Sequence, residues 1–381
     1  MLQKFLNNKP LFYDEIDYDR MPRAYEKIKH HLKIPKIIHL IGTNGKGTTG
    51  RFLASALYSL GFQTGHYTSP HILEFNERIW LNGDNVSNDA LDEAHKKLLT
   101  LLDTKTAQSL SYFEYTTLLA ILIFEGCDYI VLEAGLGGEF DATAVFENIL
   151  TLVTPIDKDH EAFLGSTIEE IAITKLNAIQ KAAIMAKQKH PQVYEIAKKM
   201  AKQKKLKTFS YQTLLDEEDK KKIKTIGKNN HLKTYLLENL SLAIAALKYL
   251  NIPYSVENFN NSKLFGRVSK ISDNILLDVG HNTLAADSLQ EMLQGKQFIL
   301  IYNSYKDKNY KEILAILQPI IKHIEIIDVD EPRVEDKAVL KKTIKQLSIE
   351  VKDFKEVHKE ENYLVFGSFS VAEQFLKAYN G

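Results

Sequence analysis

The feature that most constrains the fold is a glycine-rich turn between an apolar stretch and a helical pattern. The stretch PKIIHLIG (35–42) is short and rich in β-branched residues, as a strand buried on both faces is. It runs into TNGKGT, and a helical pattern follows over 48–60. Glycines let the amides of such a turn approach a ligand, and the helix directs its positive end to the same place. The sequence therefore predicts a strand, a phosphate-binding turn and a helix.

Two side chains of the turn carry the chemistry of a nucleotide phosphate site. Lys46 supplies a mobile positive charge, and the Thr48 hydroxyl can serve magnesium or phosphate. The common pattern G-x-x-x-x-G-K-[ST] is matched imperfectly, because Leu40 and Gly47 stand where a glycine and a hydroxyl residue are usual. The order of strand, turn, lysine, hydroxyl and helix favours a nucleotide cradle over a turn without a ligand.

Strand-like and helix-like patterns alternate on both sides of a lysine-rich middle. The alternation predicts an α/β fold with a P-loop-type parallel-sheet ATPase domain and a smaller Rossmann-like C-terminal domain. Lysines in 187–224 indicate a solvated periphery rather than a nucleic-acid patch, because acids at 216–219 interrupt them. Further predicted strands are 128–135, 149–154, 274–280, 297–302, 324–329 and 363–368, and predicted helices include 89–102, 116–125 and 232–250.

Composition and charge argue against several classes of protein. The 381 residues suit two domains, with a boundary expected near 263–266. Lys plus Arg and Asp plus Glu both number 49, which argues against a dedicated nucleic-acid binder. The single cysteine, Cys127, lies among apolar residues and is interpreted as a core residue, with no intrachain disulfide. Because the sequence shows no secretory pattern and no long apolar run, we expect a cytoplasmic protein.

A phosphate site needs a metal, and two residues after strand-like runs are candidates for holding it. Glu133 ends YIVLEA and precedes GLGG, so it is placed at the carboxyl edge of a parallel sheet, where ligands bind. The alternative is a strand end that meets solvent. His160 in TPIDKDHE follows the next strand, and its spacing favours a ligand and a structural residue equally.

The segment GSTIEEIAITKLNAI predicts a helix with a lysine on its apolar face. Ser166 and Glu169 form a capping-box pattern at its start. Lys175 falls on the stripe that contains Ile168 and Ile171. Either its side chain extends to solvent at the edge of the stripe, or it is directed into the site with a lowered pKa or a covalent modification.

Together these segments resemble the Mur ligase superfamily, and within it the folylpolyglutamate synthase/dihydrofolate synthase family of the bifunctional bacterial type. The resemblance covers nearly the whole chain, with the motifs in family order. They are GTNGKGT, TSPHILEFNERIWLNG, SYFEYTTLLA, LEAGLGGEFDAT, DHEAFLGSTIEEIAITK, FGRV, LLDVGHN and GSFSVAEQFL. The chain departs from the family pattern at Glu139 and Ala144, where an arginine and an asparagine are usual.

The resemblance implies a role for each matching residue. Residues implied to bind ATP are Gly45, Lys46, Gly47, Thr48, Asn239, Arg267 and Asp278, and magnesium would be held by Ser69, Glu133 and His160. Lys175 matches a lysine that is carbamylated in the family and whose carbamate supports a second metal. Lys46, Lys175, Arg267 and His281 are the implied catalytic residues, and Tyr112, Phe113, Glu114, Phe140 and Asp141 match positions near the pterin.

The resemblance also implies the reaction and the domains. Residues 1–264 would bind ATP and pterin, and 265–381 would complete the ATP and glutamate site. The enzyme would use ATP and Mg²⁺ to add L-glutamate to dihydropteroate and to reduced folates through an acyl phosphate, as a monomer. Open alternatives are a ligase of the same superfamily that acts on a UDP-muramoyl precursor, and an inactive nucleotide-binding paralogue.

Overall fold

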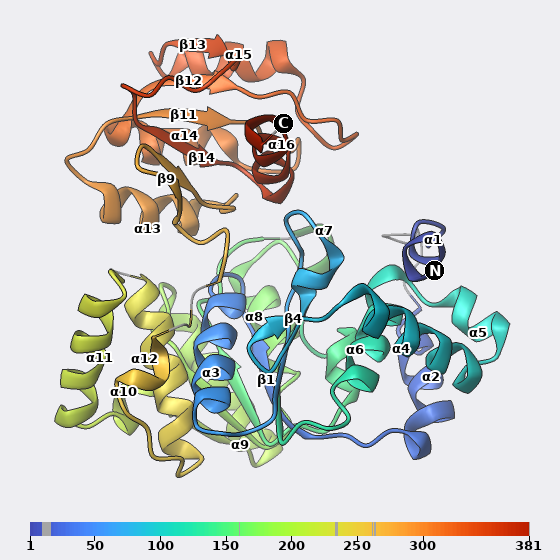
Figure 1. The fold of residues 1–381 in the computed structure, drawn as a ribbon. Helices are drawn as coiled ribbons and strands as arrows, with labels where there is room; N and C mark the ends of the chain where they lie inside the picture. The colour runs from blue at the N-terminus through green and yellow to red at the C-terminus, as the bar shows by residue number, and fades with distance from the viewer. Residues whose placement is uncertain (10–16, 160, 233–234, 261, 263, 381) are drawn as a thin grey trace. The chain divides into compact units, whose positions relative to one another are not determined.

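The computed structural model describes residues 1–9, 17–159, 161–232, 235–260, 262 and 264–380. It divides into two compact units, shown in Figure 1. The first comprises Met1–Leu232 and Leu236–Lys263, and the second comprises Lys233–Tyr235 and Leu264–Gly381. Each unit is built around its own sheet.

The first unit has an eight-stranded sheet in the order β4-β3-β2-β5-β1-β6-β7-β8. Neighbouring strands are parallel except for the antiparallel pairs β2–β3 and β3–β4. The bounds are β1 (Lys36–Ile41), β2 (Thr64–Tyr67), β3 (Ile79–Leu81), β4 (Asp84–Asn85), β5 (Tyr129–Glu133), β6 (Leu150–Val153), β7 (Ala182–Met185) and β8 (Lys207–Ser210). The first strand, β1, lies between β5 and β6, so the turn that follows it leaves from the middle of the sheet.

Helices flank this sheet (Figure 1). They are α1 (Leu2–Leu6), α2 (Arg20–Ile28), α3 (Lys46–Ser59), α4 (Asn88–Leu101), α5 (Thr104–Ser109), α6 (Tyr112–Ile123), α7 (Glu161–Leu164), α8 (Ile168–Leu176), α9 (Pro191–Lys204), α10 (Tyr211–Leu214), α11 (Glu217–Asn229) and α12 (Tyr235–Tyr249). Short 3-10 helices are η1 (Lys29–His31), η2 (Phe75–Arg78), η3 (Ala142–Val145) and η4 (Glu257–Phe259).

The second unit has a six-stranded sheet in the order β13-β12-β11-β14-β10-β9. All of its neighbouring strands are parallel except β9 and β10. The strands are β9 (Ser269–Ser272), β10 (Ile275–Leu277), β11 (Phe298–Tyr302), β12 (Ile321–Ile326), β13 (Val351–Asp353) and β14 (Tyr363–Phe366). The helices are α13 (Thr283–Leu293), α14 (Tyr310–Leu317), η5 (Gln318–Ile320), α15 (Lys337–Gln346) and α16 (Phe369–Asn380). The predicted α/β class, with two mostly parallel sheets, is confirmed.

Apolar burial explains why β1 can hold the turn in place. Ile37, Ile38, Leu40 and Ile41 are each at most 1% exposed. Burying a side chain of this size stabilises the fold by about 1.5–3 kcal/mol. The turn is therefore attached to a fully buried strand at the middle of the sheet.

Several local predictions were wrong by small shifts. The strand predicted over 324–329 is β12, at Ile321–Ile326. The helix predicted over 116–125 begins at Tyr112, because Ser111 accepts from the Glu114 amide and the Glu114 carboxylate accepts from the Ser111 amide. The capping box predicted for Ser166 and Glu169 is one residue later: Thr167 accepts from the amide of Glu170. The Glu170 carboxylate accepts from the amides of both Ser166 and Thr167, so it secures this helix start twice.

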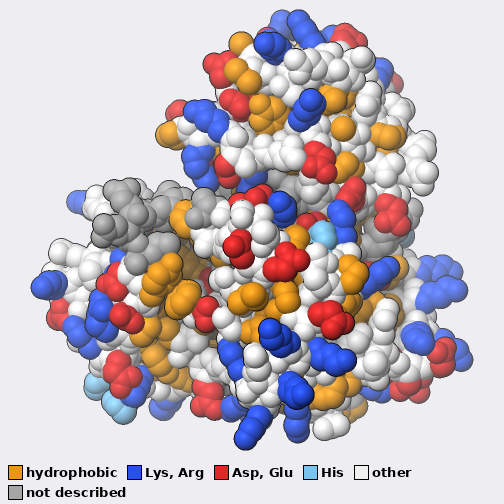
Figure 2. Space-filling view, turned by 180° about the vertical axis from the view of Figure 1, so that it is seen from behind, with side chains coloured by type: hydrophobic (Ala, Val, Ile, Leu, Met, Phe, Trp, Pro, Cys, Tyr) orange, Lys and Arg blue, Asp and Glu red, His pale blue; other side chains and the backbone are white. Residues whose placement is uncertain are grey.

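The lysine-rich middle folds as a peripheral part of the first unit. It forms α9, β8, α10 and most of α11, with β8 at the edge of the sheet. Lys198, Lys199 and Lys202 are exposed on α9. Figure 2 shows Lys and Arg side chains together with Asp and Glu on the face seen from behind, so neither charge covers that face alone.

Cys127 is partly buried against the core, as predicted. Burial, followed by the nearby Asp128 charge, raises the pKa of its thiol to about 12. A thiol of that pKa is a poor nucleophile at neutral pH. In the described part of the chain, no helix is both long and apolar enough to cross a membrane.

Candidate active site

The turn between β1 and α3 is shaped by backbone geometry and by the segment after β6. Gly45 precedes α3 with a φ of 88°, in the left-handed region. The Thr43 amide donates to the carbonyl of Pro155 at 2.9 Å, and the Thr43 hydroxyl donates to the carbonyl of Asp157 at 2.9 Å. These bonds attach the turn to the segment that follows β6.

Two buried polar side chains at the turn have no hydrogen-bond partner among the described residues. The Thr48 side chain is 3% exposed, and its Oγ1 has no hydrogen-bond partner among the described residues. The Nδ2 of Asn239, on α12, is buried and unpaired among them in the same way. A Cβ at Gly45 would lie 2.5 Å from Asn239 Oδ1, so Asn239 packs directly on the turn. Buried donors without partners are costly, which indicates that a ligand satisfies them.

Lys46 lies between the turn and a buried carboxylate. Its Nζ donates to the carbonyls of Gly42 at 3.1 Å and Thr43 at 3.3 Å, and lies 3.9 Å from Glu133 Oε1. Glu133 ends β5 and is 5% exposed, so the alternative of a strand end that meets solvent is wrong. Its Oε2 accepts from the Thr68 hydroxyl and, at 3.4 Å, from the Ser69 amide.

Of the expected metal ligands, Ser69 and Glu133 are therefore brought together, whereas His160 lies outside the described residues. Within those residues, no group of three or more His, Cys, Asp or Glu side chains could hold a metal ion. A site completed by a serine hydroxyl and phosphate oxygens is consistent with that finding, because magnesium commonly takes one or two carboxylates plus substrate phosphates.

Lys175 is buried and directed at the turn, so the alternative of a solvent-directed lysine is wrong. It is 2% exposed, and its Nζ donates to the carbonyls of Gly42 at 3.1 Å and Leu136 at 2.8 Å. Burial, followed by the Lys46 charge, lowers its pKa to about 7, although the Asp159 and Asp141 charges act in the other direction. A substantial fraction of this amine is therefore uncharged near neutral pH.

No protein-family model matches the chain. The dihydrofolate synthase/folylpolyglutamate synthase of Haemophilus influenzae is 31% identical over 346 residues, which are 81% of this chain and 77% of that protein. The Bacillus subtilis protein of the same name is 29% identical over 355 residues, or 82% of this chain and 81% of that protein. The chain belongs to the dihydrofolate synthase/folylpolyglutamate synthase family.

Solved structures of the family share the whole fold. Helicobacter pylori folylpolyglutamate synthetase is 40% identical with a TM-score of 0.81, and the match covers 100% of this chain and 98% of that chain. Escherichia coli FolC in complex with DHPP and ADP has a TM-score of 0.82 at 22% identity, covering 99% of this chain and 96% of that one. Membership of this family decides against the alternative of a UDP-muramoyl ligase.

The residues expected on the pterin side of this family member lie on α6 and on the loop after β5. Phe113 packs against that loop, since a Cβ at Gly135 would lie 2.9 Å from its ring. The Arg78 guanidinium lies 5.2 Å from the centre of the Tyr112 ring. Glu114 has structural partners: its Oε2 accepts from the Ser111 amide at 2.7 Å and from Arg20 Nε at 2.8 Å.

Phe140 and Asp141 differ sharply in exposure and bonding. Phe140 is 57% exposed, and its ring centre lies 4.3 Å from that of Tyr18, a contact that the sequence did not reveal. Asp141 Oδ2 accepts from the amides of Leu136 at 3.1 Å and Gly137 at 3.4 Å. The loop after β5 therefore folds around the Asp141 carboxylate.

The remaining expected residues belong to the second unit. Asp278 is 5% exposed, and its Oδ2 accepts from the Val268 amide at 3.0 Å and the Tyr235 hydroxyl at 3.3 Å. The Arg267 guanidinium lies 5.2 Å from the centre of the Phe369 ring. His281 lies just before α13, with its Nδ1 3.2 Å from the Val279 carbonyl.

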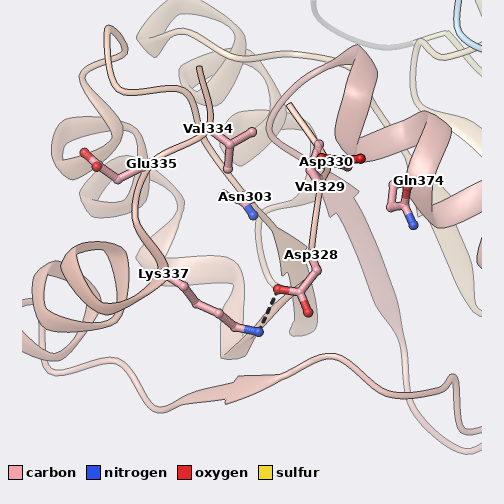
Figure 3. Close-up of a pocket in the computed structure, with 8 residues that line it drawn as sticks. All are labelled: Asn303, Asp328, Val329, Asp330, Val334, Glu335, Lys337 and Gln374. Atoms are coloured by element: carbon pink, nitrogen blue, oxygen red, sulfur yellow. Dashed lines mark hydrogen bonds and ion pairs between the residues drawn. The ribbon is translucent and has the colours of Figure 1, made fainter. Parts of the chain in front are cut away.

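The second unit also has a pocket of about 350 Å³ near the carboxyl ends of β11 and β12 (Figure 3). Its lining residues are Asn303, Asp328, Val329, Asp330, Val334, Glu335, Lys337 and Gln374. Lys337 Nζ donates to Asp328 Oδ1 at 2.8 Å and lies 2.9 Å from Asp353 Oδ1, so its charge is already neutralised. Three carboxylates line this pocket, which makes it unsuited to the two carboxylates of glutamate.

The sequence did not reveal the central role of Gly42. Its carbonyl accepts from both Lys46 Nζ and Lys175 Nζ, each at 3.1 Å. The only sequence signal for this role was a glycine that ends a buried strand and precedes a turn containing a lysine. Backbone carbonyls carry no side-chain signature, so this convergence required a structure.

A Gly45→Ala variant should lose about 5- to 30-fold in ATP affinity, since left-handed backbone costs a non-glycine residue about 1–2 kcal/mol and the turn would leave its binding shape to relieve it. The new Cβ would also collide with Asn239. Calorimetric titration with ATP and magnesium measures the effect. Gly126→Ala is the matched control, because a Cβ there meets nothing within 4 Å. Equal ATP affinity in the two variants would contradict the cradle.

Replacing Lys175 should change how the free energy of unfolding depends on pH. Burial disfavours the charged amine, so between its folded pKa of about 7 and the ordinary lysine pKa of 10.5 the unfolded chain binds more protons. The wild type therefore gains stability as pH rises through this window. Urea unfolding in CO₂-free buffer should show Lys175→Met losing stability relative to wild type from pH 7 to pH 10. A difference independent of pH would refute a depressed pKa.

Proposed function

We propose that the protein is an ATP-dependent ligase that adds L-glutamate to dihydropteroate and to reduced folates. The family assignment, which spans most of the chain, gives the reaction class. One observation supports placing this reaction at the turn after β1. Lys46 and Lys175 both donate to the Gly42 carbonyl, and the Glu133 carboxylate lies beside Lys46. Two lysine amines and one carboxylate at a glycine-rich turn are suited to a nucleotide triphosphate with its metal.

The ATP phosphates are assigned to the turn and to the start of α3. Gly45, Lys46, Gly47 and Thr48 would provide amides, an ammonium group and a hydroxyl, and Asn239 would provide its unpaired amide nitrogen. Arg267, Asp278 and His281 of the second unit are proposed as further ATP contacts. Escherichia coli FolC is known in complex with ADP, and the Yersinia pestis enzyme in complex with AMPPNP and a Mn ion.

Magnesium is assigned to Ser69, Glu133 and His160. The buried Glu133 carboxylate and the unpaired Thr48 hydroxyl fit a hard cation that prefers oxygen ligands. When bound, magnesium neutralises charge on the phosphate oxygens. We also propose two metal sites, with Lys175 as a carbamate supporting the second, because its amine is buried, has a pKa of about 7 and lies beside the turn.

The chemical problem is that a carboxylate is a poor electrophile in water. Transfer of the γ-phosphoryl of ATP to the pteroate or folate carboxylate gives an acyl phosphate with phosphate as the leaving group. The glutamate amine attacks the acyl carbon, and phosphate departs to leave an amide. Lys46 and Arg267 stabilise charge on the transferring phosphoryl, and the site positions the reactants and excludes water.

The acceptor is assigned to the surface between α6 and the loop after β5. Tyr112, Phe113 and Phe140 offer aromatic surface to a planar pterin. Glu114 and Asp141 hold this surface in shape through the bonds described above. In the proposed division of labour, the first unit binds ATP and pterin, the second completes the ATP and glutamate site, and the enzyme acts as a monomer.

The reaction is tested by phosphate release and product mass with ATP, magnesium and L-glutamate. Dihydropteroate, tetrahydrofolate and a UDP-muramoyl precursor serve as parallel acceptors. Glutamate should be added to both pterins and not to the UDP precursor. Addition to dihydropteroate alone would restrict the enzyme to dihydrofolate synthesis, and no turnover with any acceptor would favour an inactive paralogue.

Lys46→Ala and Glu133→Ala should each lower kcat by at least about a hundredfold, because each removes a group facing the transferring phosphoryl or its metal. Steady-state phosphate release measures kcat, and circular dichroism verifies folding. Lys36→Ala and Glu125→Ala are matched controls, since Lys36 begins β1 and Glu125 precedes β5 at the opposite end of the same strands. A fully active Glu133→Ala enzyme would refute the metal assignment.

A further inference from the structure

A buried hydrogen-bond network that the proposed chemistry does not use joins His39, Thr143 and Asp141. His39 is in the middle of β1 and 1% exposed, and Thr143, in η3, is also 1% exposed. His39 Nε2 lies 2.8 Å from Thr143 Oγ1, and the Thr143 hydroxyl donates to Asp141 Oδ1 at 2.7 Å. Burying a histidine in the centre of a strand is costly unless its polar atoms are hydrogen-bonded.

The proton positions in this chain follow from counting donors. A carboxylate is only an acceptor, so the single hydroxyl proton of Thr143 points to Asp141. The oxygen of Thr143 must then accept from His39, which places the imidazole proton on Nε2. His39 Nδ1 is buried and has no hydrogen-bond partner among the described residues. Burial lowers the pKa of His39 to about 4, so the ring remains a neutral donor at physiological pH.

Backbone hydrogen bonds connect Asp141 to the candidate active site. Asp141 Oδ2 accepts from the amides of Leu136 and Gly137, and the carbonyl of Leu136 accepts from Lys175 Nζ at 2.8 Å. The same loop lies close on α8, since a Cβ at Gly138 would lie 1.9 Å from the Thr174 carbonyl oxygen. The orientation of the Asp141 carboxylate thereby fixes a turn that holds Lys175.

We propose that His39 and Thr143 are positioning residues for the ligase reaction, which act by orienting the Asp141 carboxylate so that the 136–137 turn holds Lys175 against the phosphate loop. The role in the reaction rests on the proposed function, whereas the network itself does not. Neither residue touches a reacting atom. Their effect is on placement, and a displacement of about 1 Å at a catalytic group can lower a rate by about a hundredfold.

Two variants remove a hydrogen bond of the His39–Thr143–Asp141 network, and two conservative variants retain it. Thr143→Val removes the hydroxyl at nearly constant volume, and Thr143→Ser retains it. His39→Leu removes the ring donor, and His39→Gln retains an N–H donor near the position of Nε2. Thr64→Val is the matched control: Thr64 is a fully buried threonine at the amino end of β2, and its hydroxyl donates to the Phe62 carbonyl.

The first measurement is kcat and KM with each acceptor, together with amide hydrogen exchange over 134–143. Thr143→Val and His39→Leu should lower kcat by about 10- to 100-fold, with KM for ATP within about twofold. The Leu136 and Gly137 amides should exchange about tenfold faster, because they lose a fixed carboxylate acceptor. Thr143→Ser, His39→Gln and Thr64→Val should stay close to wild type in both measurements.

The second measurement uses wild-type protein and so does not depend on folding of the variants. ¹⁵N NMR of protein labelled in histidine should show His39 as the neutral Nε2–H tautomer from pH 6 to pH 9. The Nδ1–H tautomer, or unchanged exchange at Leu136 and Gly137 in folded Thr143→Val, would overturn the network. Loss of kcat in Thr64→Val equal to that in Thr143→Val would overturn the positioning role.

The two proposals fail separately. An inactive wild type with the expected tautomer and protected loop amides would refute the proposed function, and the positioning role would fall with it while the network stood. An active wild type whose kcat is insensitive to Thr143→Val and His39→Leu would overturn the positioning role alone.

Discussion

The site depends on a single backbone oxygen that accepts from two lysines. The Gly42 carbonyl binds both Lys46 and Lys175 at 3.1 Å, and two ammonium groups on one acceptor repel each other. Glu133 offsets the charge of Lys46, and burial shifts Lys175 towards its neutral form. The structure thus places the Lys46 ammonium, the Glu133 carboxylate and the buried Lys175 amine around one carbonyl. The donors gathered there suit a polyphosphate, whose charge offsets any repulsion between the two amines when it binds.

Rigid elements on every side make this arrangement possible. Gly42 follows the fully buried strand β1 at the centre of the sheet, Glu133 ends the adjacent strand β5, and Lys175 comes from the last turn of α8. Because parallel strands end at the same edge, side chains far apart in the sequence meet there. The loops between these elements contain polar groups whose orientation depends on hydrogen bonds. The loop after β5 is the clearest case, since the Asp141 carboxylate accepts from several of its amides.

The sequence was sufficient for the fold class and for the elements around the turn because those depend on local patterns. Strong apolar runs predicted β1, β5 and β6, and the observed bounds differ by one or two residues. The errors occurred where alternatives were locally equivalent. Ser166 and Thr167 are both good caps with a glutamate three residues later. Thr167 is the N-cap in the structure because the helical backbone begins at Ile168. The early start of α6 has the same origin in Ser111.

The site was predicted as a set of residues but not as a set of contacts, and the difference is physical. Side-chain types at strand ends indicate a ligand edge, which is why Lys46, Glu133 and Lys175 could be expected there. Their partners are largely backbone atoms, namely the carbonyls of Gly42, Thr43 and Leu136, which no residue type reveals. Asp141 shows the consequence most directly. Its sequence match implies a contact with substrate, yet its carboxylate accepts from the amides of Leu136, Gly137 and Thr143 and from the Thr143 hydroxyl. A carboxylate committed to four donors is suited to shaping the loop, so any effect of Asp141 on acceptor binding includes its effect on the loop that also holds Lys175.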